Sequence, residues 1–241
     1  MSITVRLSYP IQNIEQGNRM SPMVFLDRAE AGRVLAKRLE AYENQRNVLV
    51  LGIPRGGVPV AFEVAAELHA LLDVFIVRKL GVPGQEEFAF GAIASGGIRF
   101  LDTETVEAIG ISDVEVEQIT ATQAQELERR ERAYRGGRDP LMIEGQTVIL
   151  VDDGIATGSS MQAAITALRQ MKPSRLVVAV PVAPVSTCRR LKPMVDDLIC
   201  VHMPTYFRAI GEFYEDFAQV SDETVTDLLH KITREPARGV A

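Results

Sequence analysis

The sequence predicts an α/β fold built on a central parallel sheet of about five strands, with helices on both faces. Short apolar runs mark the strands, at residues 47–52, 73–79, 147–152, 175–180 and 197–202. Segments typical of helices lie between most of them, at 58–70, 159–171 and 184–192. Continuously apolar strands that alternate with helices indicate a parallel sheet covered on both faces, because no side of such a strand is suited to water.

Composition and charge exclude several classes of protein. The 241 residues are 46% hydrophobic and 24% charged, as in a soluble globular protein, and the net charge of −6 disfavours a nucleic-acid binder. No apolar run approaches the roughly 18 residues of a membrane span, and the first twenty residues lack the apolar segment of a secretion signal. Cys188 and Cys200 are too few for a disulfide framework, so we expect a cytoplasmic protein.

The chain begins with a segment of unclear periodicity, followed by the first helix. Residues 1–22 are predicted to be an N-terminal extension, and the core is expected at 23–100 and 140–203. In "DRAEAGRVLAKRLEAYENQ" the spacing places Ala31, Leu35, Leu39 and Tyr42 on one helical face.

Between Gly81 and Asp139 the alternation of strand and helix stops. A pair of short strands is expected around Gly96–Gly97, and Ser112 to Glu115 form a capping box that opens a long polar helix to about Tyr134. Residues 101–139 are therefore predicted to be a helical insertion. The five arginines of "ERRERAYRGGR" are typical of a solvated helix face, with a binding patch as the alternative.

The last segment, 204–241, is rich in aromatic residues and ends in a predicted helix. Ser221 is a candidate N-cap, and an apolar stripe follows at Val225, Leu228, Leu229 and Ile232.

Chemistry is concentrated in "VILVDDGIATGSS", residues 148–160. Asp152 and Asp153 follow a predicted strand, at the sheet edge where ligands of open parallel sheets bind. The amides of residues 156–160, at the start of the next helix, can bind an anion, and Gly158 lets the backbone come close. The chain lacks both the Walker A pattern and the G-x-G-x-x-G fingerprint. Carboxylates accept hydrogen bonds from vicinal hydroxyls, so the pattern predicts a site for a pentose 5-phosphate. The alternative is a strand-end turn that binds no ligand.

This stretch resembles the signature of type I phosphoribosyltransferases, which use 5-phosphoribosyl-1-pyrophosphate (PRPP), and the layout is similar from about Met20 to Ile232. The whole chain is most similar to bacterial members of unassigned acceptor. The resemblance implies that Asp152 and Asp153 hold the ribose hydroxyls and act in catalysis. It also implies that the 5-phosphate is bound by Ala156, Thr157, Gly158, Ser159 and Ser160.

The resemblance also assigns the groups that meet pyrophosphate. "GIPRGGVPVA" (52–61) fits the family's pyrophosphate loop, with Arg55, Gly56 and Gly57 as the contacts and a non-proline cis peptide at Arg55–Gly56 or next to it. Lys79, at the end of the second predicted strand, resembles the family lysine, with a strand-end surface lysine as the alternative. Residues 81–91 take the place of a mobile loop that closes over PRPP. Mg²⁺ is expected near Asp152 and Asp153, held by PRPP oxygens and waters rather than directly by the protein.

The resemblance implies transfer of a 5-phosphoribosyl group to a nitrogen acceptor in nucleotide metabolism, with release of pyrophosphate. Segment 204–241 is similar to the family's hood over the acceptor, where Phe213 and Tyr214 are candidates to stack on it; core packing is their alternative. Ala156 replaces a carboxylate that contacts the base in purine-salvage relatives, so the acceptor and the general base stay open. The expected partners are PRPP and a small-molecule acceptor, with a homo-oligomer as an open question. Two alternative functions remain: a PRPP or nucleotide sensor without turnover, and a phosphorolytic or hydrolytic enzyme.

Overall fold

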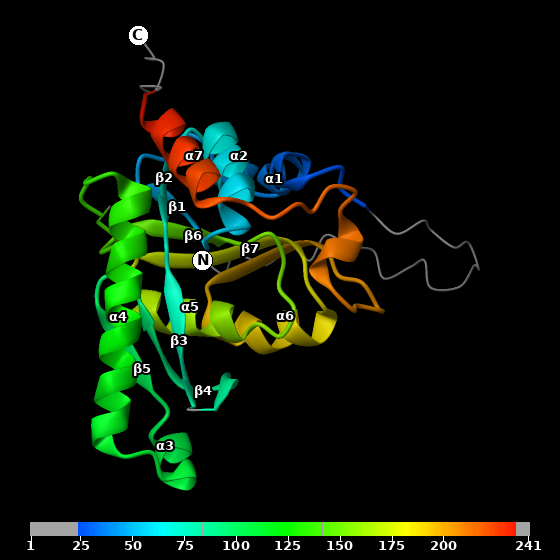
Figure 1. Cartoon of the computed structure of the whole chain (residues 1–241). Helices are drawn as coiled ribbons and strands as arrows, with labels where there is room; N and C mark the ends of the chain where they lie inside the picture. The colour runs from blue at the N-terminus through cyan, green and yellow to red at the C-terminus, as the bar shows by residue number, and fades with distance from the viewer. Residues whose placement is uncertain (1–23, 83, 141, 235–241) are drawn as a thin grey trace, which may run out of the picture.

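A five-stranded parallel sheet forms the centre of the molecule, as the sequence predicts (Figure 1). The structure, a computed structural model, describes residues 24–82, 84–140 and 142–234, so the predicted extension at 1–22 lies outside it. The strand order is β2-β1-β6-β7-β8. The strands are β1 (Val48–Gly52), β2 (Leu71–Val74), β6 (Thr147–Val151), β7 (Arg175–Val182) and β8 (Asp197–His202).

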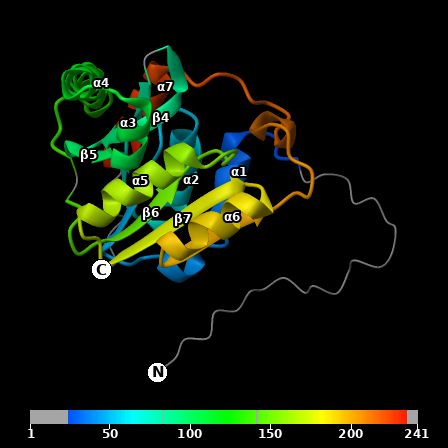
Figure 2. The same ribbon diagram turned by 90° about the horizontal axis from the view of Figure 1, so that it is seen from below.

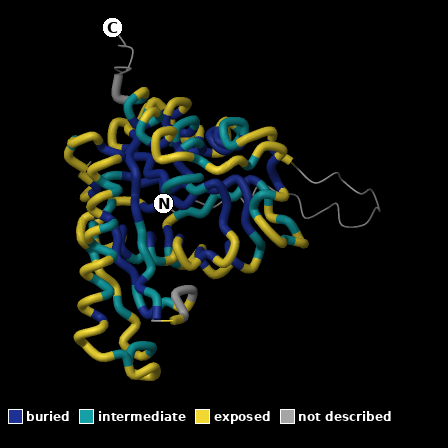
Figure 3. The backbone as a smooth tube through the Cα atoms, in the orientation of Figure 1, coloured by how far each residue is buried: buried dark blue, intermediate teal, exposed yellow. Residues whose placement is uncertain are grey.

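The strands are apolar throughout because helices cover both faces of the sheet. Val48, Val50 and Ile149 pack toward α1 (Arg28–Ala36), α2 (Gly57–Leu68) and α7 (Asp222–Arg234). The alternate residues, such as Leu49 and Leu150, pack toward α5 (Ser159–Gln170) and α6 (Val185–Leu191). Figure 2 shows α5 and α6 on the near face, with α1 and α2 beyond the sheet, and Figure 3 shows the strands between them as buried. Two single-turn 3-10 helices, at Glu40–Tyr42 and Lys192–Met194, complete the connections.

The predicted strand at 73–79 is wrong, because the chain changes sheets in the middle of that run. β2 ends at Val74, and β3 (Val77–Val82) belongs to a separate antiparallel sheet of order β3-β4-β5. Ile76 marks the change, since its amide donates to the Ser95 hydroxyl (2.9 Å) and its carbonyl accepts from the Ser95 amide (2.9 Å). The residues around the break stay apolar and buried, so the sequence pattern carries no sign of it.

In the segment 81–91, where we expected a mobile loop, Gly81 and Val82 lie in β3 and residues 85–91 lie in the next strand of a β-hairpin. Closure over PRPP stays a prediction. β4 (Gln85–Ala94) pairs with β3 and with β5 (Ile98–Leu101). Phe90 is buried and Phe88 is exposed, although residues two apart lie on the same face of a regular strand. The difference coincides with a register shift in the pairing with β3, where Leu80 lies opposite Gly91 and Gly81 lies opposite Ala89. The turn between β4 and β5 lies at Gly96 and Gly97, as the sequence predicts, and both glycines have the positive φ that the turn requires.

Two helices, α3 (Thr103–Ile109) and α4 (Asp113–Arg135), occupy most of the predicted insertion. The capping box is present: the Ser112 hydroxyl accepts from the Glu115 amide, and the Glu115 carboxylate accepts from the Ser112 amide. α4 runs along one side of the molecule and is largely exposed (Figures 1 and 3). The division of the chain into core and insertion stays a prediction.

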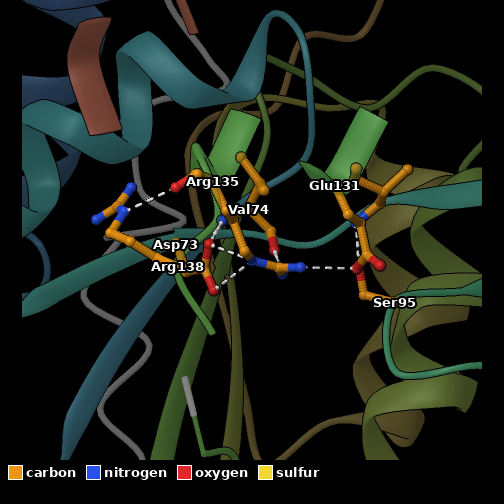
Figure 4. Close-up of polar contacts among 7 residues, drawn as sticks. Asp73, Val74, Ser95, Glu131, Arg135 and Arg138 are labelled. Atoms are coloured by element: carbon orange, nitrogen blue, oxygen red, sulfur yellow. Dashed lines mark hydrogen bonds and ion pairs between the residues drawn. The ribbon is translucent and has the colours of Figure 1, made fainter. Parts of the chain in front are cut away.

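The C-terminal end of α4 is fastened to the edge strand β2 by a buried ion pair (Figure 4). The Arg135 Nε lies 3.1 Å from both carboxylate oxygens of Asp73, and both side chains are 8% exposed. Arg135 also donates to Glu131 (2.9 Å) and to the carbonyl of Val74 (3.2 Å). Arg135 therefore has a structural role that a solvated helix face does not explain.

The C-terminal segment covers the other end of the sheet. The Phe25 amide donates to the Phe213 carbonyl (2.9 Å), and the Glu215 amide donates back to the Phe25 carbonyl (2.8 Å). A 3-10 helix, η3 (Ile210–Phe213), precedes this pairing. Ser221 caps α7 as predicted, since its hydroxyl accepts from the Thr224 amide (3.0 Å). We call residues 204–220 the hood from here on. In the described ranges, none of the helices combines the length and apolarity needed to cross a membrane.

Candidate active site

The two loops singled out by the sequence meet at the carboxyl edge of the sheet. β1 and β6 are parallel neighbours, with Gly52 opposite Val151, so the loops that follow them start side by side. A Cβ atom on Gly57 would lie 2.8 Å from Asp152 Cα, and one on Gly56 would lie 2.0 Å from Asp153 Oδ2. The loop after β1 thus needs bare backbone where it contacts the acidic pair. A non-proline cis peptide joins Pro54 and Arg55, one bond before Arg55–Gly56.

Asp152 and Asp153 form a close, poorly solvated acidic pair. The Asp152 Oδ1 accepts from the amide of Asp153 (2.9 Å), and the Asp153 Oδ2 pairs with the Arg28 Nε (2.8 Å). Burial raises the pKa of Asp152 well above its ordinary value, and the neighbouring Asp153 charge raises it further. Burial also raises the pKa of Asp153, although Arg28 opposes the rise. Such a pair favours ligands that donate hydrogen bonds or carry positive charge.

The loop predicted to bind phosphate opens α5. Ala156, Thr157, Ser159 and Ser160 are exposed, while Gly158 is buried with φ of +78°. Gly158 is the N-cap, and no side chain caps the helix, which leaves the first amides of α5 open to a ligand. The Thr187 hydroxyl donates to the carbonyl of Ala156 (2.8 Å), and Arg190 donates to the carbonyl of Thr157. These two hydrogen bonds from α6 fix the backbone of the loop that precedes α5.

Arg55 and Lys79 come from different parts of the fold: Arg55 from the loop after β1, and Lys79 from the small antiparallel sheet. The Arg55 Nη1 lies 3.9 Å from Asp222 Oδ1 at the start of α7, and the same oxygen accepts from the Tyr134 hydroxyl (2.7 Å). Burial and the bond to Asp222 raise the pKa of Tyr134 to about 12. Lys79 lies on β3 rather than at the end of a strand of the main sheet. With Ser159 it lines a cavity of about 340 Å³ between the small sheet and α5.

Phe213 and Tyr214 lie in the hood but are buried, at 5% and 6% exposure. Phe213 stacks on Phe207, with ring centroids 5.6 Å apart, and Tyr214 packs between Phe25 and Phe217. The Tyr214 hydroxyl donates to the carbonyl of Asp153 (2.6 Å). Burial and the Asp153 charge raise the pKa of Tyr214. Stacking on an acceptor stays a prediction for both rings, and their burial is what the packing alternative predicts.

Sequence reasoning missed the side chains that support the site from outside the two loops. Arg28 pairs with Asp153, Asp222 pairs with Arg55, and Thr187 holds the loop before α5. Nothing in the local pattern separates Arg28 from Arg33, which is another arginine of the same helix. Only the folded structure brings these residues to the site.

Comparisons with known proteins find relatives in one family. A family model described as a phosphoribosyl transferase domain matches residues 26–201. Two strains of Mycobacterium tuberculosis, CDC 1551 / Oshkosh and H37Rv, each have a relative named as a candidate phosphoribosyl transferase. Each is 43% identical over 218 residues, which cover 90% of this chain and 49% of the relative. This chain therefore spans about half the length of the curated relatives it matches.

A solved structure extends the likeness to the fold. The protein TT1426 of Thermus thermophilus is 42% identical and superposes with a TM-score of 0.77. The match covers 87% of this chain and 99% of that protein. Together with the family match over residues 26–201, this shows that the chain belongs to the phosphoribosyl transferase family.

Proposed function

We propose that the chain transfers the 5-phosphoribosyl group of PRPP to a nitrogen acceptor, in a Mg²⁺-dependent reaction that releases pyrophosphate. The acceptor is proposed to be a heterocycle similar to a nucleobase. One observation carries the proposal: the acidic pair, the glycine loop after β1 and the uncapped start of α5 meet at one edge of the sheet. These are the groups that a sugar with a phosphate at one end and a pyrophosphate at the other needs.

Each part of the site has a proposed task. The amides of residues 156–160 bind the 5-phosphate, with hydroxyl donors from Thr157, Ser159 and Ser160. Asp152 and Asp153 accept from the ribose hydroxyls and stabilise the positive charge that develops on the sugar when its bond to pyrophosphate breaks. The repulsion between the two neighbouring carboxylates supports this task, because a developing cation relieves it.

The departing pyrophosphate is proposed to meet Arg55, Lys79 and the bare backbone of Gly56 and Gly57. Arg55 offers a planar fork of donors, which suits the oxygens of a phosphate group. When bound, Mg²⁺ supplies further positive charge to the pyrophosphate. Among the described residues there is no group of three His, Cys, Asp or Glu side chains that could hold a metal ion. The metal is proposed to be carried mainly by substrate oxygens and waters.

The experiment that tests the function is calorimetry with PRPP and Mg²⁺, followed by assays of pyrophosphate release with a panel of nucleobases. Release that requires a base supports transfer. Release without a base would instead indicate hydrolysis, and tight binding without release would indicate a sensor. A chain that does not bind PRPP would contradict the proposal.

Replacing Arg55 by Ala is expected to lower the affinity for pyrophosphate by about 10- to 100-fold, the worth of charge-assisted hydrogen bonds. The affinity for ribose 5-phosphate should change little, because Arg55 faces the pyrophosphate end. Calorimetry with each ligand separates the two effects. Arg46→Ala is the control, since Arg46 is exposed and precedes β1 at the opposite edge of the sheet. Equal losses for both ligands would contradict the assignment of Arg55.

A further inference from the structure

Arg28, the first residue of α1, reaches across the site and joins three separate groups. Its Nε lies 2.8 Å from Asp153 Oδ2, and its Nη1 donates to the carbonyl of Ala218 in the hood (2.8 Å). Its guanidinium carbon lies 3.9 Å from the ring centroid of Phe217, a cation–π contact with the hood. The side chains of Arg28 and Asp153 are 12% and 11% exposed, so solvent does little to weaken their pairing.

The hood also holds residue 153 through its backbone. The Tyr214 hydroxyl donates to the carbonyl of Asp153 (2.6 Å), and Phe25, three residues before Arg28, forms an isolated parallel β-bridge with Tyr214. The hood thus contacts both ends of one aspartate: Tyr214 contacts its main chain, and Arg28 links its carboxylate to Ala218 and Phe217.

The third side of Asp153 is closed by the loop after β1. A Cβ atom on Gly56 would lie 2.0 Å from Asp153 Oδ2, the same oxygen that pairs with Arg28. Asp152 is held differently, through a bond to the amide of its neighbour. The two acidic residues are therefore not equivalent, since the orientation of Asp153 depends on α1, the hood and the loop after β1 together.

We propose that Arg28 is a positioning residue that couples the hood to the acidic pair. The inference rests on the proposed function, because it concerns how the hood regulates the proposed PRPP site. A ribose that binds Asp153 holds its carboxylate in place, and through Arg28 this orders the segment around Phe217 and Ala218. By thermodynamic reciprocity, an ordered hood must then strengthen PRPP binding by the same factor. PRPP binding and ordering of the hood are therefore coupled.

Hydrogen exchange read by mass spectrometry, with and without PRPP and Mg²⁺, tests the coupling on peptides from the hood. In the wild-type chain we expect PRPP to slow exchange in residues 204–220. Arg28→Gln should lower PRPP affinity about tenfold or more and, at saturating PRPP, should lose the added protection of the hood. Arg28→Lys keeps a charge beside Asp153 but lacks the planar fork that reaches Ala218, so it should restore affinity more than protection.

Two further variants separate coupling from folding. Arg33→Gln is the matched control, because Arg33 lies on the same helix, is 49% exposed and faces Glu63 at 3.5 Å; it should behave as the wild type. Tyr214→Phe keeps the ring in the hood and removes the bond to Asp153, so it should reduce both affinity and protection several-fold. It tests the proposal even if Arg28→Gln does not fold.

The outcomes distinguish the inference from the function beneath it. One outcome would make Arg28 structural only and the inference wrong. In it, Arg28→Gln binds PRPP as the wild type does, and its hood exchanges faster than that of the wild type by the same factor with and without PRPP. The inference is also wrong if PRPP binds to the wild type and supports turnover without protecting the hood. A wild-type chain that does not bind PRPP would overturn the proposed function and the inference together.

Discussion

Asp152→Asn is expected to lower phosphoribosyl transfer by about 100-fold or more without destabilising the chain. Asparagine keeps the shape and can still accept from the Asp153 amide, but it removes the charge that stabilises the developing cation on the sugar. Loss of one such preorganised group typically costs about 10²–10³ in rate. Pyrophosphate release, PRPP calorimetry and thermal melting together measure the three effects.

The stability part of this prediction follows from the direction of the pKa shift. Burial and Asp153 raise the folded-state pKa of Asp152 above its unfolded value. The shift therefore lowers the stability of the folded state at pH values above the unfolded-state pKa, and this cost disappears as the pH falls from the folded-state pKa to the unfolded-state pKa. Asn removes the cost, so the melting temperature of Asp152→Asn should equal or exceed that of the wild type.

Asp153→Asn is the matched control, because its carboxylate is paired with Arg28 at 2.8 Å. Its loss should reduce activity and raise the melting temperature less than Asp152→Asn does, because it removes a buried charge but also leaves a nearly buried guanidinium facing a neutral side chain. Unfolding of both variants would instead favour a strand-end turn with no catalytic role.

The main sheet and the two loops at its edge could be predicted from the sequence because their signals are local. Four of the five predicted apolar runs, such as the one at 147–152, are single strands. The glycines that contact the acidic pair, Gly56 and Gly57, lie in the loop that the resemblance to the family indicates. The break at Ile76 could not be predicted. It depends on hydrogen bonds to Ser95, nineteen residues away, while the local run stays apolar.

The residues that pair with the site residues could not be predicted from the sequence for a related reason. Arg28 is 125 residues from Asp153 in the chain, and Asp222 is brought to Arg55 only by the docking of α7 against α2 and α4. Arginines at exposed and buried positions of one helix look alike in sequence. Their roles follow from tertiary neighbours, which is why Arg28 was not among the expected site residues and Arg135 was not separated from Arg132.

Asp73→Ala is expected to lower the free energy of unfolding by about 3 kcal/mol, at the low end of the usual 3–5 kcal/mol for one partner of a buried ion pair. The variant leaves the Arg135 charge at the buried end of α4 with Glu131 and a backbone carbonyl, but without the two oxygens 3.1 Å away. For a chain of this size, 3 kcal/mol corresponds to a fall in melting temperature of about 6–12 °C. Chemical denaturation, with melting as a second probe, measures the change.

Two companions show that the loss comes from the buried pair. Arg132→Ala removes an arginine from the same helix that is 81% exposed and paired with Glu128, and such surface pairs are worth about 0–1 kcal/mol. Replacing both partners, as Asp73→Ala with Arg135→Met, should recover much of the loss, because no isolated charge is then buried. If the double variant is as unstable as the sum of its single variants, the two side chains do not act as a pair. In that case α4 must be held to the fold by its packing against β3, β4 and α7.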